Sequence, residues 1–173
     1  NDLSDEAILR LVGQYGDAER IALGIDAPLS YEFGGGDRPA DRNLRQAIAV
    51  IGMKTSSIMA PTAPRMSYLT MRGMALSRAL ERSACTAELR IAEVHPGAAI
   101  GFRIRSRPVP AAVLRYKQPE HAADRAHLAE WLEREMGLRG VAVRLGERPS
   151  SHEVDACAAA LAAWKWVNGR HKW

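Results

Sequence analysis

Residues 21–25, with the sequence Ile-Ala-Leu-Gly-Ile, limit the fold of this chain more than any other segment. All five side chains are apolar or absent, whereas a strand with one wet face alternates polar and apolar residues. The segment is therefore predicted to be a strand buried on both faces, in the middle of a sheet. Pro28 then stops the strand, because its φ is fixed and it has no N–H to donate. Asp26 is left at the carboxyl end of a central strand, where open α/β sheets bind their ligands.

The composition is that of an ordinary globular protein. The chain has 173 residues, 47% hydrophobic and 25% charged, which suits one domain with a proper core. Its net charge is +4, carried largely by arginine, whose planar guanidinium suits phosphates and carboxylates. The charge favours a polyanionic partner, although a solvated basic surface explains it equally well.

Neither a membrane nor a disulfide is expected. No apolar run reaches the roughly 20 residues that span a bilayer. Cys85 and Cys157 are far apart and fit no metal-ligand spacing, so both are predicted to be reduced thiols of a cytoplasmic protein.

Helical and strand periodicity predicts a chain of alternating elements. Helices are expected over about 4–16, 44–51, 67–82 and 122–136, the first of them capped by Ser4. A second strand is expected over 89–94. Residues 141–145 are predicted to be a short edge strand or an extended loop. The last helix begins at a capping box formed by Ser150 and Glu153. We expect a single domain, with a helical and loop insertion at about 34–85.

Two polar stretches allow more than one interpretation. Gly34, Gly35 and Gly36 lack the P-loop lysine, so a flexible loop is favoured over a phosphate cradle. A later basic stretch either follows a phosphate backbone or is solvated loop charge. It consists of Arg103, Arg105, Arg107, Arg115 and Lys117.

Three carboxylates have compatible predicted positions. Asp26 and Glu93 lie at strand ends, and Asp155 lies on the first turn of the last helix, one turn from His152. An outward-facing strand residue is an equally good interpretation of Glu93, and an acid favoured by the helix dipole is an alternative interpretation of Asp155. Together, three carboxylates suit Mg²⁺ or Mn²⁺. Two such ions, about 4 Å apart, activate a water and stabilise the leaving oxygen of a phosphodiester.

An ordered set of motifs resembles the predicted ribonuclease-H-like nucleases grouped as domain of unknown function 429. The matching segments are Gly24 to Leu29, Arg38-x-x-Asp41-Arg42, Ser56-Ser57 to Arg65, Glu93 to Pro96, and Asp155 to Leu161. This resemblance implies an α/β fold of three layers, α/β/α, with a mixed sheet and helices on both faces. It also implies a RuvC-like nuclease that binds two divalent metals.

The resemblance assigns roles to residues of this sequence. Asp26 and Asp155 correspond to the metal-binding acids of the fourth strand and the final helix, and Glu93 to an additional acid of the family. The loop motifs would place four residues near the substrate: Asp41, Arg42, Thr62 and Arg65. The family also has an N-terminal β-meander with a leading catalytic aspartate, and this sequence starts after it. We therefore expect an unpaired strand edge, and a chain that is poorly soluble or inactive alone.

Three functions are compatible with these patterns. The first is a metal-dependent nuclease in which Asp26, Glu93 and Asp155 hold Mg²⁺ or Mn²⁺. The second is a non-catalytic scaffold of the same fold that binds nucleic acid or a protein through its arginines. The third is a phosphotransferase acting on a small nucleotide, which the glycine run favours but no phosphate-binding lysine motif supports. The sequence does not distinguish DNA from RNA.

Overall fold

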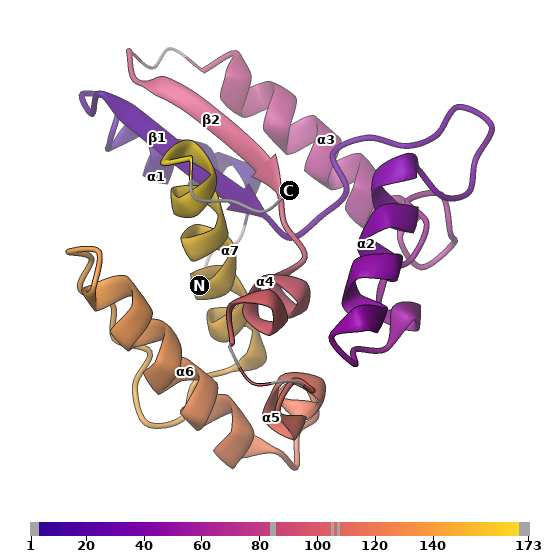
Figure 1. Cartoon of the computed structure of the whole chain (residues 1–173). Coiled ribbons are helices and arrows are strands. Elements are labelled where there is room, and N and C mark those ends of the chain that lie inside the picture. Colours follow the sequence, from indigo (N-terminus) through magenta and orange to yellow (C-terminus); the bar gives the residue numbers. More distant parts are fainter. Residues whose placement is uncertain (1–3, 84–85, 105, 107, 170–173) are drawn as a thin grey trace.

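The protein is an α/β fold built around two parallel strands, β1 (Arg20–Ile25) and β2 (Glu88–Glu93). The computed structural model describes residues 4–83, 86–104, 106 and 108–169. The strands pair in register, with Arg20 opposite Glu88 and Ile25 opposite Glu93. Figure 1 shows helices on both sides of this small sheet.

Seven α-helices and one short 3-10 helix are assigned within the described residues. They are α1 (Asp5–Gly13), α2 (Pro39–Val50), the 3-10 helix η1 (Thr55–Ser57), α3 (Ser67–Glu81), α4 (Pro96–Arg103), α5 (Ala111–Arg115), α6 (Ala122–Gly137) and α7 (Ser151–Val167). The segment 34–85 predicted as an insertion contains α2, η1 and α3, which connect β1 to β2. Its description as an insertion in a single domain stays a prediction.

The alternation of side chains along β1 decides what each face of the strand contacts. Ile21, Leu23 and Ile25 pack against a small apolar cluster that contains Val12 of α1 and Leu80 of α3. Gly24 faces the opposite side, where a Cβ atom on it would lie 2.4 Å from the carbonyl oxygen of Ala159 in α7. Helix α7 therefore approaches the strand backbone closely, as its run of alanines predicts.

The prediction that β1 lies in the middle of a sheet is wrong for the described part of the chain. There β2 is the single strand that pairs with it, and residues 21–25 are only half-buried. The apolar run has another cause: its alternate residues serve two different layers, the α1 and α3 cluster on one face and α7 on the other.

Several predicted elements are confirmed. The Ser4 hydroxyl caps α1 by accepting a hydrogen bond from the Ala7 N–H at 3.2 Å. At the start of α7, Ser150 and Glu153 form the predicted capping box, a motif that satisfies two helix-end donors. Helices α2, α3 and α6 lie where the periodicity places them, although α2 already begins at Pro39.

The basic stretch is folded differently from the prediction. Arg103 is the last residue of α4 and Arg115 the last residue of α5, two helices that the sequence analysis did not predict. Arg115 forms an ion pair with Asp124, and Lys117 with Asp155, so these two are not a row of solvated cations. Arg105 and Arg107 lie outside the described residues.

Smaller differences concern loops and surface. Residues 141–145 form an extended loop without strand pairing. Met71 of α3 is 64% exposed, although helical periodicity places other residues of that helix in the core. Cys157 is a buried free thiol, as predicted, and Cys85 falls outside the described residues. None of the described helices combines the length and the apolar character needed to cross a bilayer, and the cytoplasmic location stays a prediction.

The main core lies away from the strands, among α4, α5, α6 and α7. Its innermost side chains, Ile100, Leu128, Leu132, Val154 and Leu161, are almost completely buried. This core fixes α7 and α5 relative to one another, and with them the acidic residue near the start of α7.

Candidate metal and phosphate site

Asp26 and Asp155 approach each other at the carboxyl end of β1. Asp26 follows Gly24 by two residues, so alternation places its side chain on the α7 face of the sheet. Asp155 lies on the first turns of α7 and is only 8% exposed. The two carboxylates are close enough for the negative charge of Asp155 to contribute to a raised pKa at Asp26. The strand and the helix thus bring these predicted residues together.

Asp155 is held by two neighbouring residues of the chain. The Tyr116 hydroxyl donates a hydrogen bond of 2.5 Å to its Oδ1, and the Lys117 Nζ lies 2.8 Å from its Oδ2. Tyr116 is almost completely buried, and burial, then the charge of Asp155, raise the pKa of its hydroxyl. Asp155 is therefore held in place by a hydrogen bond to one oxygen and by a cation beside the other.

Asp26 has a different environment. No hydrogen bond is made to its carboxylate by any residue in the described part of the chain. The residue as a whole is exposed, yet loss of water around the carboxylate raises its pKa, and the charge of Lys117 acts against that rise. Two histidines, His95 and His152, also act on this carboxylate electrostatically. Of the two carboxylates, Asp26 is thus the one whose oxygens are free of hydrogen bonds from the described residues.

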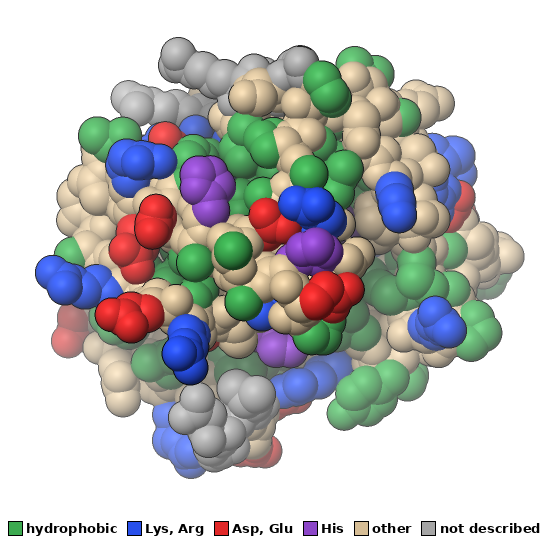
Figure 2. Space-filling model, turned by 90° about the horizontal axis from the view of Figure 1, so that it is seen from below, with side chains coloured by type: hydrophobic (Ala, Val, Ile, Leu, Met, Phe, Trp, Pro, Cys, Tyr) green, Lys and Arg blue, Asp and Glu red, His purple; other side chains and the backbone are tan. Residues whose placement is uncertain are grey.

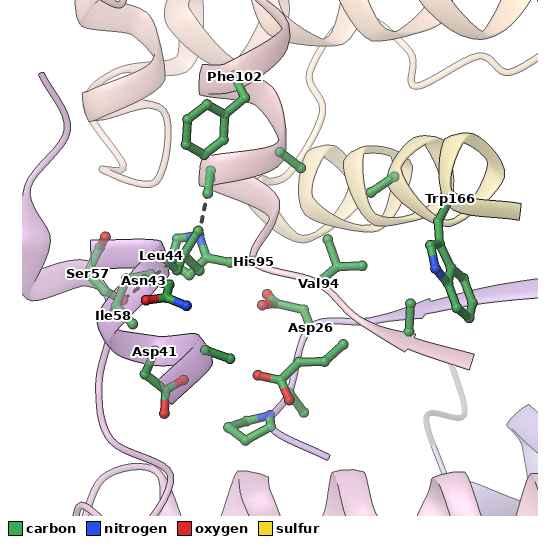
Figure 3. A pocket seen from close by; sticks show the side chains of 18 of the residues that line it. Asp26, Asp41, Asn43, Leu44, Ser57, Ile58, Val94, His95, Phe102 and Trp166 are labelled. Atoms are coloured by element: carbon green, nitrogen blue, oxygen red, sulfur yellow. Dashed lines mark hydrogen bonds between the residues drawn. The ribbon is translucent and has the colours of Figure 1, made fainter. Parts of the chain in front are cut away.

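His95 is oriented by the backbone around it. Its Nδ1 accepts a hydrogen bond of 3.1 Å from the Ala98 N–H at the start of α4, so the proton of a neutral ring lies on Nε2. That nitrogen is 3.3 Å from the Ser57 carbonyl oxygen, which is placed to accept it. Figure 3 shows His95 between the end of β2 and α2, on the same side of the pocket as Asn43.

Glu93 does not join the two aspartates. It is the partner of Ile25 in the sheet, so its side chain points to the α1 and α3 face, opposite to that of Asp26. Its two oxygens lie 2.5 and 2.7 Å from the Arg38 guanidinium, and the Leu29 N–H donates to it at 2.9 Å. The grouping of Glu93 with Asp26 and Asp155 is therefore not what the structure shows.

Arg38 is buried and links the buried Asp41 to the more exposed Glu93. Besides Glu93, it contacts both oxygens of Asp41, at 2.9 and 2.6 Å. Asp41 also accepts a hydrogen bond from the Arg38 backbone N–H and so caps α2. Glu93 and then Asp41 raise the pKa of Arg38. The sequence placed Arg38 in a loop motif but did not predict that it bridges Asp41 and Glu93.

A pocket of about 990 Å³ opens at these strand ends. Residues from the end of β1, from α2 and from the end of β2 line one part of it, including Asp26, Arg38, Asp41 and Glu93. Figure 3 shows Asp26 pointing from β1 towards α2. Residues of α4, α6 and α7 line the remainder, among them Phe102 and Trp166. The pocket is large enough for a nucleotide-sized ligand.

The comparison with protein families covers nearly the whole molecule. The family described as protein of unknown function (DUF429) matches residues 4–172. The chain belongs to the DUF429 family. Neither the curated proteins nor the solved structures contain a match to it.

Three of the four loop residues singled out in this DUF429 chain, Asp41, Arg42 and Thr62, have structural partners. Arg42 is exposed and donates a hydrogen bond of 2.7 Å to the Asp37 carbonyl oxygen. The Thr62 hydroxyl accepts one of 2.9 Å from the N–H of Gly36, a residue with φ of +78°. Arg65 is exposed, and Asp41 is buried against Arg38. Their predicted role in substrate contact stays a prediction.

Replacing Asp26 by asparagine is expected to stabilise this DUF429 chain at neutral pH. An acid whose pKa is raised on folding opposes folding once it ionises. This cost is absent below about pH 3 and grows as the pH rises above the ordinary value of about 4. Melting temperatures from pH 3 to 8 should show an Asp26→Asn advantage that appears only towards neutral pH. Asp17→Asn, at an exposed position, is the control, and an advantage independent of pH would contradict the prediction.

Proposed function

We propose that this protein is a divalent-metal-dependent phosphodiester hydrolase with a ribonuclease-H-like fold. The observation that carries the proposal is the pair formed by Asp26 and Asp155, two interacting carboxylates of which one has no hydrogen-bond donor in the described part of the chain. Neighbouring carboxylates repel each other, and a cation between them removes that repulsion. Nucleic acid is the proposed substrate, and the basic net charge of +4 supports this class.

The residues present fit Mg²⁺ or Mn²⁺ in part. Asp26 and Asp155 offer the hard oxygen ligands that both ions prefer. Glu93 does not fit in this conformation, because Arg38 and the Leu29 N–H occupy its oxygens. No three His, Cys, Asp or Glu side chains among the described residues gather closely enough to hold an ion together. An ion held by two carboxylates takes its other ligands from water and substrate phosphate, as Mg²⁺ commonly does.

Each residue near the pair then has a role in the proposed reaction. An ion held by Asp26 and Asp155 would supply electrostatic stabilisation of the charge that develops on the phosphate oxygens. Tyr116 keeps Asp155 in position through its hydrogen bond. Lys117 balances part of the negative charge. His95 follows β2, and its Nε2 lies near the carbonyl oxygen of Ser57 in η1; both residues line the pocket.

Cleavage of single-stranded, duplex and branched DNA and RNA tests the proposal. Cutting is expected with Mg²⁺ or Mn²⁺ and not with EDTA. Asp26→Asn should lower the rate at least about 100-fold, as loss of a group that stabilises transition-state charge does. Asp17→Asn makes the same charge change at an exposed position and should stay within about twofold of the native rate.

Metal binding is measured separately by calorimetry with Mn²⁺. The native protein should bind Mn²⁺, and Asp26→Asn and Asp155→Asn should each weaken binding at least about tenfold. A native protein that neither cuts any substrate nor binds Mn²⁺ would contradict the proposal, as would unchanged cleavage by Asp26→Asn.

One observation favours a second candidate, a non-catalytic scaffold that binds nucleic acid. Lys117 already supplies a cation to Asp155 at 2.8 Å, so the pair is partly neutralised without a metal. The face drawn in Figure 2 has basic and acidic side chains interspersed, with no broad basic patch, which argues against extensive contact with a phosphate backbone on that face. A scaffold of this kind would bind oligonucleotides equally well with Asp26→Asn and in EDTA, without cutting them.

A further inference from the structure

Two arginines far apart in the sequence meet in the lining of the pocket, on other elements than the aspartate pair. Arg103 is the last residue of α4, and Arg139 follows α6. Burial, and then the positive charge of Arg139, lower the pKa of Arg103, while Glu135 acts in the opposite direction. Glu135 is paired with Arg139, with 3.0 Å between its Oε2 and the Arg139 Nη2. Glu135 thus pairs with Arg139 and acts on Arg103 through its charge.

Each of these arginines has a donor with no acceptor. In the described part of the chain, the side-chain N–H groups left buried without a hydrogen-bond partner are the Nε–H of Arg103 and the Nε–H of Arg139. Arg103 does donate through Nη1 to the Ala99 carbonyl oxygen, at 2.8 Å. A buried donor without an acceptor lowers stability, and two adjacent like charges lower it further. The unpaired donors and the like charges of Arg103 and Arg139 therefore lower the stability of the folded protein.

Both arginines line the pocket, and Arg139 also contacts an indole ring. The Arg139 guanidinium lies 5.5 Å from the ring centre of Trp164, within the range of a cation–π contact. Arg103, Glu135 and Arg139 all line the pocket, together with Lys165 and Trp166 of α7. This end of the pocket thus has three basic side chains and one acidic one, beside an indole ring.

We propose that Arg103 and Arg139 bind a phosphate group carried by a nucleotide or by a nucleic-acid strand. A dianionic phosphate accepts several hydrogen bonds and matches the planar fork of a guanidinium. Bound between the two groups, it would neutralise their repulsion and accept from donors that a small side-chain adjustment makes available. Trp166 gives the attached sugar or base an apolar surface in the same pocket. This binding does not rest on the proposed cleavage, because it needs neither Asp26 nor a metal.

Calorimetry in EDTA, where no cleavage occurs, tests the site. The ligands are adenosine monophosphate, adenosine, inorganic phosphate and a short single-stranded oligonucleotide. Adenosine monophosphate should bind at least about tenfold more tightly than adenosine, since the phosphate adds charge-assisted hydrogen bonds. Inorganic phosphate should compete with it. Binding of the oligonucleotide without the mononucleotide would assign the site to a strand phosphate.

Three variants separate this site from net charge. Arg103→Met and Arg139→Met should each weaken binding of the phosphate ligands at least about tenfold. Arg90→Met removes the same charge from an exposed arginine of β2 that is paired with Glu88, and it should change affinity less than about twofold. Equal losses in all three variants, or equal affinity for adenosine and its monophosphate, would overturn the proposal.

Thermal unfolding excludes a purely structural role for the two arginines. Without ligand, Arg103→Met should melt at the same temperature as the native protein or higher, because the substitution removes a repelling charge and an unpaired donor. Millimolar phosphate should raise the melting temperature of the native protein and not that of Arg103→Met. A large drop in melting temperature for both Arg103→Met and Arg139→Met would identify them as structural and overturn the proposal.

Discussion

Arg38→Met is expected to destabilise the protein by about 3–5 kcal/mol, the effect of removing one partner from a buried ion pair. Arg38 is 8% and Asp41 5% exposed, and Arg38 also contacts both oxygens of Glu93. Methionine keeps the apolar stem of the side chain but leaves two carboxylates close together without a cation. Urea unfolding followed by circular dichroism should show a lower midpoint with an unchanged slope.

Arg42→Met is the matched control, since Arg42 lies on the same helix, is exposed, and donates to a backbone carbonyl oxygen. Its effect should stay below about 1 kcal/mol. Adding Asp41→Asn and Glu93→Gln to Arg38→Met should recover part of the loss, because the unpaired charges are then gone. A loss below 1 kcal/mol for Arg38→Met alone would show that solvent reaches the cluster and screens it.

Gly24→Ala is expected to cost about 2–3 kcal/mol or more, at the upper end of overpacking substitutions. The new Cβ would lie 2.4 Å from the Ala159 carbonyl oxygen and 2.8 Å from its carbonyl carbon. Both are backbone atoms inside α7, so no side-chain rotation relieves the clash. The helix must move away from β1, which also separates Asp155 from Asp26. Urea unfolding measures the loss, and near-UV circular dichroism of Trp164 and Trp166 reports the movement of α7.

Gly137→Ala provides the comparison for this prediction. Gly137 ends α6, and a Cβ there meets no atom within 4 Å. Alanine in place of a helical glycine should stabilise the protein by up to about 1 kcal/mol. If Gly24→Ala were as stable as the native protein, the close approach of α7 to the sheet would be wrong.

Sequence patterns predicted the elements that local chemistry determines. The capping boxes and caps of α1 and α7 depend on residues three positions apart, and the strand ending before Pro28 depends on a run of neighbours. The pairing of Asp26 with Asp155 was also within reach, because a strand end and a helix start are both visible in the sequence.

Contacts between distant segments were not predictable in the same way. Nothing local to Arg38 indicates a bond to Glu93, 55 residues later. Leu89, Ile91 and Glu93 alternate along β2 and so share one face of the strand. To conclude that Glu93 points away from Asp26, one must also know the register of β2 against β1. Helices α4 and α5 were missed because Pro96 and Pro110 suggested breaks, whereas Pro96 is the first residue of a helix.

The carboxylate of Glu93 binds both ends of the loop that follows β1. Leu29 opens that loop with its N–H on Glu93, and Arg38 closes it on the same carboxylate. Between these two anchors the chain reaches into solvent, where Phe33 is 98% exposed. Since one side chain clamps both ends, residues can be gained or lost at the loop tip without moving Asp26. The molecule therefore has a position where family members can diverge, or where a peptide can be grafted, while the pocket beneath it keeps its shape.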